Sequence, residues 1–484
     1  MIDSETENDP KIGFLSILKR LWPGFIIHNS FAFTLSTIFI NFLIVSNLIW
    51  PGESFHSGEM GILVGTSTYA MAFSGILFGI LADRYSRRLL MSITEIIFGF
   101  GYLLNGFVAQ GLGLETFNYF LLFSLIRGFA TGGFWPIINS FGNDSTKEEE
   151  RSQFFGMLQA LFQLFQIVGM VVSAVLFQNS FWREYFSIIG IIYIIFGLLI
   201  LAKSNEPKRA STHKELREVL SNDDVSYKYK LNKETIKLTI FTPTNIIAFI
   251  EGMFTTVMLM IPDFLFIPYI QSDPYNISPF ASSIFMIMFG LPGGLMGSLA
   301  LAKLSDRLAK RNIKNRVYLI VISIIGLFGF YIALFFLPLP HLNVDQGNNL
   351  GLLLSFPMIW MLGIIALIAR AVVGLWNINQ PPILQAINLP EAQGTISSAN
   401  QFLENIGSGT GPIIAGTILA LFSNNYQLTV GITMGIGIIG GLLWLLATQW
   451  INKDVNRISE ILKERSIELA ENNKNEKQKS NKIQ

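Results

Sequence analysis

Four ionisable residues, Arg127, Glu251, Arg370 and Glu404, lie well inside long apolar stretches of this 484-residue chain. A charge at the centre of a bilayer costs about 2.5–3.5 kcal/mol on insertion scales unless it is paired or solvated. Two positive and two negative residues could form ion pairs that hold helices together. Alternatively, Arg127 and Arg370 could clamp an anionic head group while Glu251 or Glu404 carries a proton. The residue types leave both roles open.

Polar side chains form stripes within three of these apolar stretches. They recur every three or four residues, which places them on one helix face. Such a face should line an aqueous cavity, although hydrogen bonding between helices is the alternative. From the stripes we select Thr37, Asn41, Gln163 and Gln401 as candidate solute contacts. The stripes comprise Ser30, Thr34, Thr37 and Asn41; Gln159, Gln163 and Gln166; and Ser397, Gln401, Glu404 and Ser408.

Two further acids, Glu95 and Asp263, lie nearer the ends of their stretches. A carboxylate close to the membrane surface remains in contact with water and needs no buried partner. We therefore expect both acids to be interfacial or gate charges.

The apolar stretches that carry these residues are long enough to cross a membrane. Hydrophobic residues make up 51% of the chain and charged residues only 14%. A bilayer core of about 30 Å needs roughly 20 apolar residues per helix. The stretches 239–270 and 355–386 are long and contain Pro262 or Pro381 and Pro382, and we interpret each as one kinked helix. The twelve predicted spans are 25–49, 58–82, 89–110, 116–142, 152–178, 185–202, 239–270, 280–302, 317–338, 355–386, 393–422 and 427–451.

Basic residues are segregated to alternate gaps between the spans. These gaps and the two terminal segments hold 31 of the 34 Lys and Arg residues. Cytoplasmic loops of membrane proteins retain Lys and Arg, whereas translocated loops lose them. We therefore expect both termini to be cytoplasmic and the protein to reside in the plasma membrane. The expected organisation is a cytoplasmic segment 1–24, six-helix bundles 25–202 and 239–451, a cytoplasmic linker 203–238 and a tail 452–484. The linker includes a candidate amphipathic helix at 214–220, and the tail should be disordered from about residue 471.

The two bundles repeat a short charged motif. Segment 79–90 reads G-I-L-A-D-R-Y-S-R-R-L-L, and segment 302–311 reads A-K-L-S-D-R-L-A-K-R. Each follows the second span of its half. Repeats of this kind are expected in a transporter whose site lies between the two halves, near the membrane midplane.

These motifs and the six-plus-six layout resemble the major facilitator superfamily over residues 20–451. Arg127-Gly128 and Gln393-Gly394-Thr395 are similar to the Spinster-type branch, which is associated with lysolipid export. The resemblance implies an all-α membrane protein of twelve transmembrane helices in two pseudo-symmetric bundles, working as a monomer. It also implies a gate in which Asp83 meets the start of span eleven and Asp306 the start of span five. The gating residues would be Asp83, Arg84, Arg87, Arg88, Asp306 and Arg307.

Several classes of function lack a sequence signature. The chain has no cysteine, and its four histidines make no metal-ligand spacing. No phosphate-binding loop or nucleophile elbow occurs, so we predict neither an enzyme nor a cofactor or metal. The basic clusters flank apolar spans instead of forming the continuous face that nucleic-acid binding requires.

The sequence therefore predicts a secondary transporter that works by alternating access in the lipid bilayer. We expect its partner to be a small organic solute, coupled to a proton or a counter-solute. The two arginines favour an organic anion or a lysolipid-like amphiphile. The alternatives are a sugar or a cationic drug, handled by the acids, and a non-transporting membrane sensor.

Overall fold

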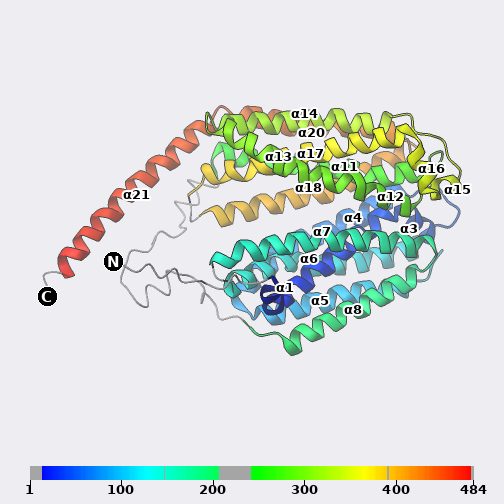
Figure 1. Cartoon of the computed structure of the whole chain (residues 1–484), viewed down its shortest axis with the longest axis horizontal. Helices are drawn as coiled ribbons and strands as arrows, with labels where there is room; N and C mark the ends of the chain where they lie inside the picture. Colours follow the sequence, from blue (N-terminus) through cyan, green and yellow to red (C-terminus); the bar gives the residue numbers. More distant parts are fainter. Residues whose placement is uncertain (1–13, 147, 207–240, 390–391, 481–484) are drawn as a thin grey trace, which may run out of the picture.

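The computed structural model describes residues 14–146, 148–206, 241–389 and 392–480. Figure 1 shows two helical halves lying side by side, with the start of the first helix and the last helix at the same end of the molecule. We call the end of the halves near Arg87 and Arg316 the termini end. The opposite end, near Trp50, Gln178 and Tyr426, is the distal end.

The first half is built from residues 14–203. Its first span is broken near Leu21, Ser36 and Asn41, where the backbone departs from regular helix. Ser86 caps the third span by accepting a hydrogen bond from the amide of Leu89, which satisfies an otherwise free donor. The helices are α1 Phe14–Leu35, α2 Thr37–Ile40, α3 Phe42–Ile49, α4 Ser57–Arg84, α5 Arg87–Gly106, α6 Leu114–Ser145, α7 Glu148–Gln178 and α8 Trp182–Lys203.

The second half is built from residues 243–447 and is followed by a long terminal helix. Thr242 and Ser278 cap helices that carry proline in the first turn, a position where its missing amide is not needed. The elements are α11 Pro243–Gln271, α12 Pro279–Phe285, the π-helical η1 Met286–Gly290, α13 Leu291–Ala309, α14 Lys314–Phe336, α15 Val344–Asn348, α16 Leu350–Ser355, α17 Pro357–Ala386, α18 Gln393–Leu421, α19 Tyr426–Thr433, α20 Gly435–Ala447 and α21 Ile451–Ser480.

The arrangement confirms the predicted fold class of twelve spans in two six-helix bundles within the described residues. Eleven helical segments are long and apolar enough to cross a membrane. The twelfth span is α18, which carries the polar stripe with Gln401 and Glu404 and packs on α4 and α11. The second span of each half packs against the fourth, α4 on α6 and α13 on α17. The long stretches 239–270 and 355–386 each form one continuous helix, α11 and α17.

Two boundaries differ from the sequence-based expectation. Helix α1 begins at Phe14, inside the segment 1–24 that was expected to precede the first bundle. Helix α21 continues to Ser480, where disorder was expected from about residue 471. Lys, Glu and Gln are good helix formers even without apolar partners. A polar composition is therefore compatible with a helix in this segment. The candidate amphipathic helix at 214–220 lies outside the described residues.

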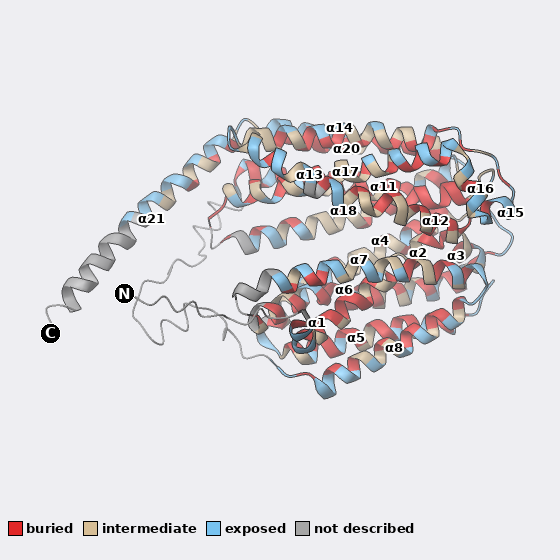
Figure 2. Cartoon of the chain, in the orientation of Figure 1, coloured by how far each residue is buried: buried red, intermediate tan, exposed pale blue. Residues whose placement is uncertain are grey.

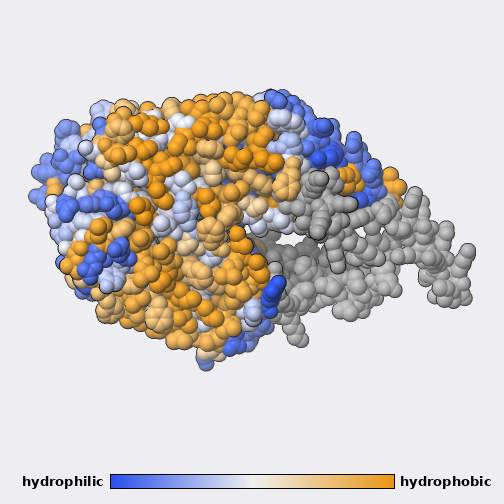
Figure 3. Space-filling view, turned by 180° about the vertical axis from the view of Figure 1, so that it is seen from behind, coloured by the Kyte–Doolittle hydropathy of each residue, from blue (hydrophilic) through white to orange (hydrophobic). Residues whose placement is uncertain are grey.

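The surface is apolar around the middle of the molecule. Figure 3 shows hydrophobic side chains over the body of one face and hydrophilic side chains toward both ends. Figure 2 shows buried residues along the sides where helices meet and exposed residues along the outward sides. Ile188, Ile322 and Ile325 are more than half exposed there. A band of this kind suits contact with lipid.

The two halves contact each other mainly toward the distal end. Hydrogen bonds between described residues of the two halves join Ser57 to Gly416, Tyr69 to Thr410, Gln178 to Asn348 and Phe280, Gln271 to Ile40, and Asn424 to Phe55. Along α4 and α18 the last aromatic contact toward the termini end is Phe73 against Phe402. Figure 1 shows the halves farther apart at the termini end. The distal end is therefore closed in this state.

Candidate functional site

Arg370 of α17 is held by Asp263 of α11. The guanidinium donates two hydrogen bonds to the carboxylate, at 2.6 Å and 3.2 Å. Such two-point pairing is the strongest geometry available to an arginine. The side chains remain 31% and 21% exposed, so the pair is only partly sealed from solvent. Asp263 was expected to be an interfacial or gate charge; instead, it neutralises Arg370, because α11 and α17 bring the two side chains into contact.

Glu251 and Glu404 lie in the same half, among neutral hydrogen-bond donors. Glu251 is fully buried and accepts hydrogen bonds from Thr255 Oγ1 at 2.5 Å and Trp376 Nε1 at 3.2 Å. Glu404 accepts one from Asn400 Nδ2 at 2.6 Å. Both acids thus accept hydrogen bonds from uncharged groups. Such carboxyls can hold or release a proton without breaking an ion pair.

Glycine at position 252 allows the Glu404 side chain to approach α11 closely. A Cβ at this position would lie 3.2 Å from Cγ of Glu404 and 3.4 Å from Nε2 of Gln380. Thr256, one turn further along α11, donates a hydrogen bond to the backbone carbonyl of Glu404 at 2.9 Å. These contacts fix the depth of Glu404 relative to Glu251.

Arg127 of α6 has different surroundings, although it is the repeat counterpart of Arg370. It is 5% exposed and donates to Ser124 Oγ at 3.0 Å and to the carbonyl of Gly101 at 3.5 Å. Its guanidinium lies over the ring of Tyr102, 4.8 Å from the centroid, a favourable cation–π position. Within the described residues, no carboxylate pairs with Arg127. None of the four predicted intramembrane charges pairs with another.

The predicted polar stripes have different surroundings from one another. Thr37 and Asn41 are fully buried; Thr37 shares a 2.6 Å hydrogen bond with Tyr185 of α8, and Asn41 donates to the carbonyl of Thr37. The first stripe therefore joins helices within one half, the alternative that the sequence left open. By contrast, Gln401 is exposed and Gln163 is half-buried.

Glu95 is not interfacial in this structure. It is fully buried, on the face of α5 whose next aromatic residues, Phe98 and Tyr102, pack against Tyr193 of α8. The expectation from sequence was wrong because α5 enters the bundle within its first two turns. The position of Glu95 in the sequence, shortly after the motif 79–90, did not reveal that its side chain is buried.

Arg87 and Arg88 at the start of α5 converge on Glu206, which follows α8. The Glu206 carboxylate accepts hydrogen bonds from the amides of Arg87 and Arg88, both at 2.9 Å, and from Ser86 Oγ at 2.5 Å. Burial works against the charged form, but these hydrogen bonds and the Arg87 charge lower the pKa of Glu206 overall. An anion at a helix N-terminus is favourable, so Glu206 fixes the start of α5. Arg87 also donates to Ser140 at 3.0 Å, and Arg88 donates to the carbonyl of Leu201.

The corresponding region of the second half uses a different ion pair. Asp306 pairs with Arg316 of α14 at 2.7 Å, and the Asp306 side chain is 64% exposed. Arg84 and Arg307 are exposed at the ends of α4 and α13. The side chains of Asp83, Gln393 and Arg151 lie outside the described residues, so the predicted contacts of the two gate acids stay predictions.

Sequence reasoning missed three partners in these clusters: Glu206, Arg316 and Tyr185. Glu206 and Arg316 lie in loops or at helix starts and read as ordinary surface charges. Tyr185 lies within an apolar run, where an aromatic residue predicts packing alone. A tyrosine that faces a threonine stripe on another helix is recognisable only from the packing. Among the described residues, no group of three or more His, Cys, Asp or Glu could hold a metal ion.

Comparison with known proteins identifies a family that shares this architecture. A model of the Major Facilitator Superfamily matches residues 30–345. The chain is 23% identical over 447 residues to a protein named as a probable sugar efflux transporter of Helicobacter acinonychis (strain Sheeba), covering 90% of this chain and 98% of that protein. It is 23% identical over 438 residues to the multidrug resistance protein MdtG of Escherichia coli O81 (strain ED1a), covering 89% and 95%.

A solved structure shares the fold. It is a bacterial homologue of the human lysosomal transporter Spinster, in an inward-facing and unoccupied conformation, with a TM-score of 0.70 and 17% identity over 90% of this chain and 98% of that chain. Paired six-helix halves, the apolar band and the family match all indicate an integral membrane transporter. The chain belongs to the Major Facilitator Superfamily.

Proposed function

We propose that this protein is a proton-coupled transporter of a small, uncharged, polyhydroxylated solute, a sugar or a close analogue. In this proposal the termini end faces the cytoplasm, and the solute leaves the cell when the distal end opens. The protein works as a monomer in the plasma membrane. The proposed orientation rests on the basic residues, 31 of 34 of which lie in the gaps and terminal segments assigned to the cytoplasm.

The Arg370–Asp263 pair is the observation that carries the proposal. An arginine that already has a carboxylate in two-point contact has little remaining charge to offer an anionic solute. Other polar groups of this half include the amides of Gln380, Asn400 and Gln401, which donate and accept hydrogen bonds. Amides suit hydroxyl groups, because a hydroxyl both donates and accepts. The efflux of sugars is also the activity in the name of the Helicobacter relative.

Proton coupling is assigned to Glu404, with Glu251 as its buried neighbour. Glu404 is half-buried and Glu251 fully buried. Of the two, Glu404 can therefore exchange a proton with water more readily. Protonation changes the hydrogen bond from Asn400, and the solute hydroxyls compete for the same amides. The transporter alternates between a state with the distal end closed and a state with the distal end open. Solute and proton each shift this equilibrium because each binds the two states with different affinity.

Counterflow in proteoliposomes tests the solute class. Vesicles preloaded with unlabelled glucose, arabinose or lactose should accumulate the corresponding labelled sugar, and a pH gradient should change the rate. Glu404→Gln should keep counterflow but lose the response to pH, because exchange needs no net proton movement. Gln449→Glu, which adds a carboxyl outside the cluster, is the control for altered charge. Absence of sugar counterflow in a folded wild-type protein would refute the proposal.

A second candidate is an anionic amphiphile, and Arg127 favours it. This arginine has no carboxylate partner within the described residues, and Tyr102 lies beside it. A single acidic head group could therefore bind there without an arginine pair. The same assay with a labelled lysophospholipid distinguishes the two candidates, because only the second predicts exchange that is lost in Arg127→Gln.

A further inference from the structure

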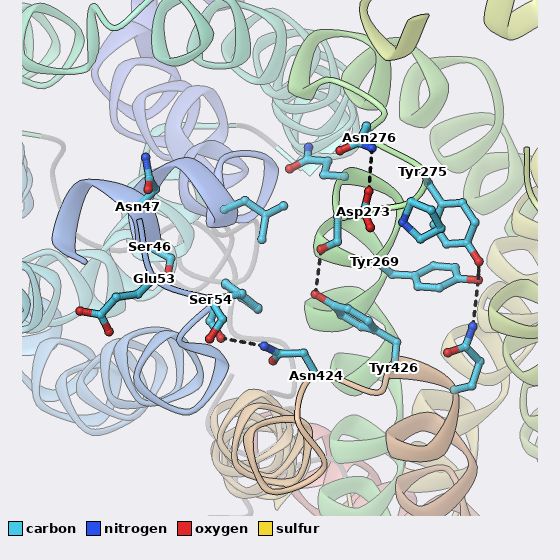
Figure 4. A pocket seen from close by; sticks show the side chains of 16 residues that line it. Ser46, Asn47, Glu53, Ser54, Tyr269, Asp273, Tyr275, Asn276, Asn424 and Tyr426 are labelled. Carbon is cyan, nitrogen blue, oxygen red and sulfur yellow. Dashed lines mark hydrogen bonds between the residues drawn. The ribbon is translucent and has the colours of Figure 1, made fainter. Parts of the chain in front are cut away.

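The structure contains a polar cavity of about 570 Å³ at the distal end, between the two halves. Figure 4 shows side chains reaching into it from both sides. One wall comes from α3 and the loop before α4, with Asn47 and Ser54. The other wall comes from the end of α11, the loop that follows it and the start of α19, with Tyr269, Tyr275 and Tyr426. The cavity is separate from the acids and arginines of the candidate solute site.

The lining is rich in hydroxyl, amide and aromatic groups. Besides its tyrosines, it contains Glu53 and Asp273 but no Lys, Arg or His among the residues that line it. The hydroxyls of Tyr269 and Tyr275 are 3.2 Å apart, and Tyr426 shares a 3.3 Å contact with Ser272 Oγ. Aromatic rings offer flat apolar faces with a polar edge. This combination can hold a molecule that carries C–H faces and many hydroxyl groups.

Two side-chain amides of the lining have an oxygen that accepts no hydrogen bond from the part of the chain that the structure describes. Gln271 is 8% exposed; its Nε2 donates to the carbonyl of Ile40 in the other half at 3.0 Å. Asn424 likewise donates through Nδ2 to the carbonyl of Phe55 at 3.3 Å. Within the described residues, Gln271 Oε1 and Asn424 Oδ1 have no hydrogen-bond partner. Both oxygens are buried and belong to residues that line the cavity. Buried polar atoms usually have a partner, so ligand hydroxyls that reached these oxygens would supply the missing donors.

We propose that this distal cavity is a second binding site, for a polyhydroxylated ligand such as a mono- or disaccharide. The ligand's O–H groups donate to Gln271, Asn424, Asp273 and Glu53, and its ring packs on the tyrosines. An ammonium ion would satisfy the acceptors, but it cannot accept from the hydroxyl and amide donors of the same wall. The identity of the ligand rests on the proposed function, since it is the class of solute that the transporter would release at this end.

Occupancy of this cavity depends on the state of the two halves. Because its walls come from both halves, they separate when the distal end opens. A ligand that binds only the closed arrangement shifts the equilibrium toward it. Solute that accumulates on the distal side therefore slows further opening, which gives the transporter feedback from its own product.

A thiol placed in the cavity tests the site directly. The chain has no cysteine, so Ser54→Cys introduces a single thiol in the exposed part of the lining. Its reaction with a maleimide is followed in purified protein in lipid nanodiscs, with glucose, arabinose, lactose or choline. Asn179→Cys, at the distal end of α7 and outside the cavity, is the matched control.

At least one of the sugars should slow labelling of Ser54→Cys about threefold at twice its dissociation constant. The same sugar should leave Asn179→Cys unaffected. Adding Asn424→Ala to Ser54→Cys should abolish the protection while thermal unfolding stays cooperative. Protection that survives Asn424→Ala would come from the central site and would overturn the proposal. So would protection by choline alone, or labelling that no sugar slows.

The outcomes separate this inference from the proposed function. If sugars exchange in the counterflow assay but do not protect Ser54→Cys, the distal site is wrong and the transport proposal stands. If a sugar protects the thiol but does not exchange, the distal site stands and the transported solute is of another class.

Discussion

Arg127 and Arg370 occupy related positions in the two halves of this transporter, yet their surroundings differ. Arg370 is held by a carboxylate in two-point contact. Arg127 is held by a hydroxyl, a backbone carbonyl and an aromatic ring. In the second half a carboxylate therefore neutralises the charge of Arg370. In the first half neutral groups stabilise Arg127 without neutralising its charge. Arginines at related positions of the two halves therefore have different surroundings.

The difference assigns separate tasks to the halves. In the second half, the acids that remain unpaired, Glu251 and Glu404, lie among neutral donors, which suits reversible protonation. In the first half, Arg127 retains a positive charge inside the bundle. A symmetric clamp of two arginines, as the sequence suggested, is not what this arrangement favours.

The largest effect is expected from Asp263→Asn. Removing one partner of a buried ion pair leaves the other charge uncompensated, which costs about 3–5 kcal/mol. The partial exposure of this pair puts the expected loss of unfolding free energy at the lower end of that range. It can be measured by denaturant titration in mixed micelles. The double variant Asp263→Asn/Arg370→Gln should recover most of the loss.

Asp306→Asn is the matched control for that measurement. The Asp306 carboxylate lies 2.7 Å from the guanidinium of Arg316, but the Asp306 side chain is 64% exposed, and exposed pairs contribute about 0–1 kcal/mol. Equal losses for Asp263→Asn and Asp306→Asn would show that burial does not govern these pairs.

Gly65→Ala should disturb the contact that closes the distal end. A Cβ at this position would overlap the carbonyl of Gly409 and lie 2.6 Å from Cδ1 of Ile413 on α18, and overpacking costs about 1–3 kcal/mol. The closed state should lose population. Spin labels at Leu112→Cys and Val344→Cys, both exposed at the distal end, should report a longer mean distance.

Gly79→Ala is the control on the same helix, because nothing lies within 4 Å of a Cβ there. It should leave the distance between the labels unchanged. An equal lengthening in both variants would mean that helix propensity, and not the contact between the halves, controls the opening.

Arg127→Met should cost less stability than Asp263→Asn. Its loss removes a cation–π contact and two hydrogen bonds, worth about 2 kcal/mol together, but leaves no carboxylate without a partner. The same mixed-micelle titration measures the difference. A loss as large as that of Asp263→Asn would indicate that Arg127 compensates an acid after all.

The smallest effect is expected from Glu206→Gln at the start of α5. A charge at a helix N-terminus contributes about 0.3–1 kcal/mol. Because the folded-state pKa of Glu206 lies below its ordinary value of 4.5, the contribution is present above that pH and is lost as pH falls below it. Thermal unfolding should therefore separate wild type from the variant at neutral pH and not in acid. A difference that persists in acid would contradict this origin.

The fold was predictable because each membrane span is a continuous apolar run in the sequence. Twelve spans, the two halves and the continuous helices α11 and α17 all follow from hydropathy. The start of α1 did not follow, because Lys19, Arg20 and Pro23 interrupt its apolar residues. The end of α21 did not follow, because its polar composition permits both helix and coil.

The site was less predictable because which side chains contact one another depends on packing between helices far apart in sequence. Residue type indicated that Arg370 needs compensation, but not that Asp263, 107 residues away, supplies it. Likewise, Thr37 and Asn41 form a stripe whether the opposite surface is water or Tyr185. The burial of Glu95 depends on the depth at which α5 enters the bundle.

The central claim is that Arg370 and Asp263 form a self-contained pair, so the transported solute carries no charge for Arg370 to bind. Sugar counterflow by Asp263→Asn/Arg370→Gln in proteoliposomes tests it most directly. The account predicts exchange similar to that of wild type, because the substitution removes both charges together. Loss of exchange in a double variant that is folded would show that Arg370 binds the solute.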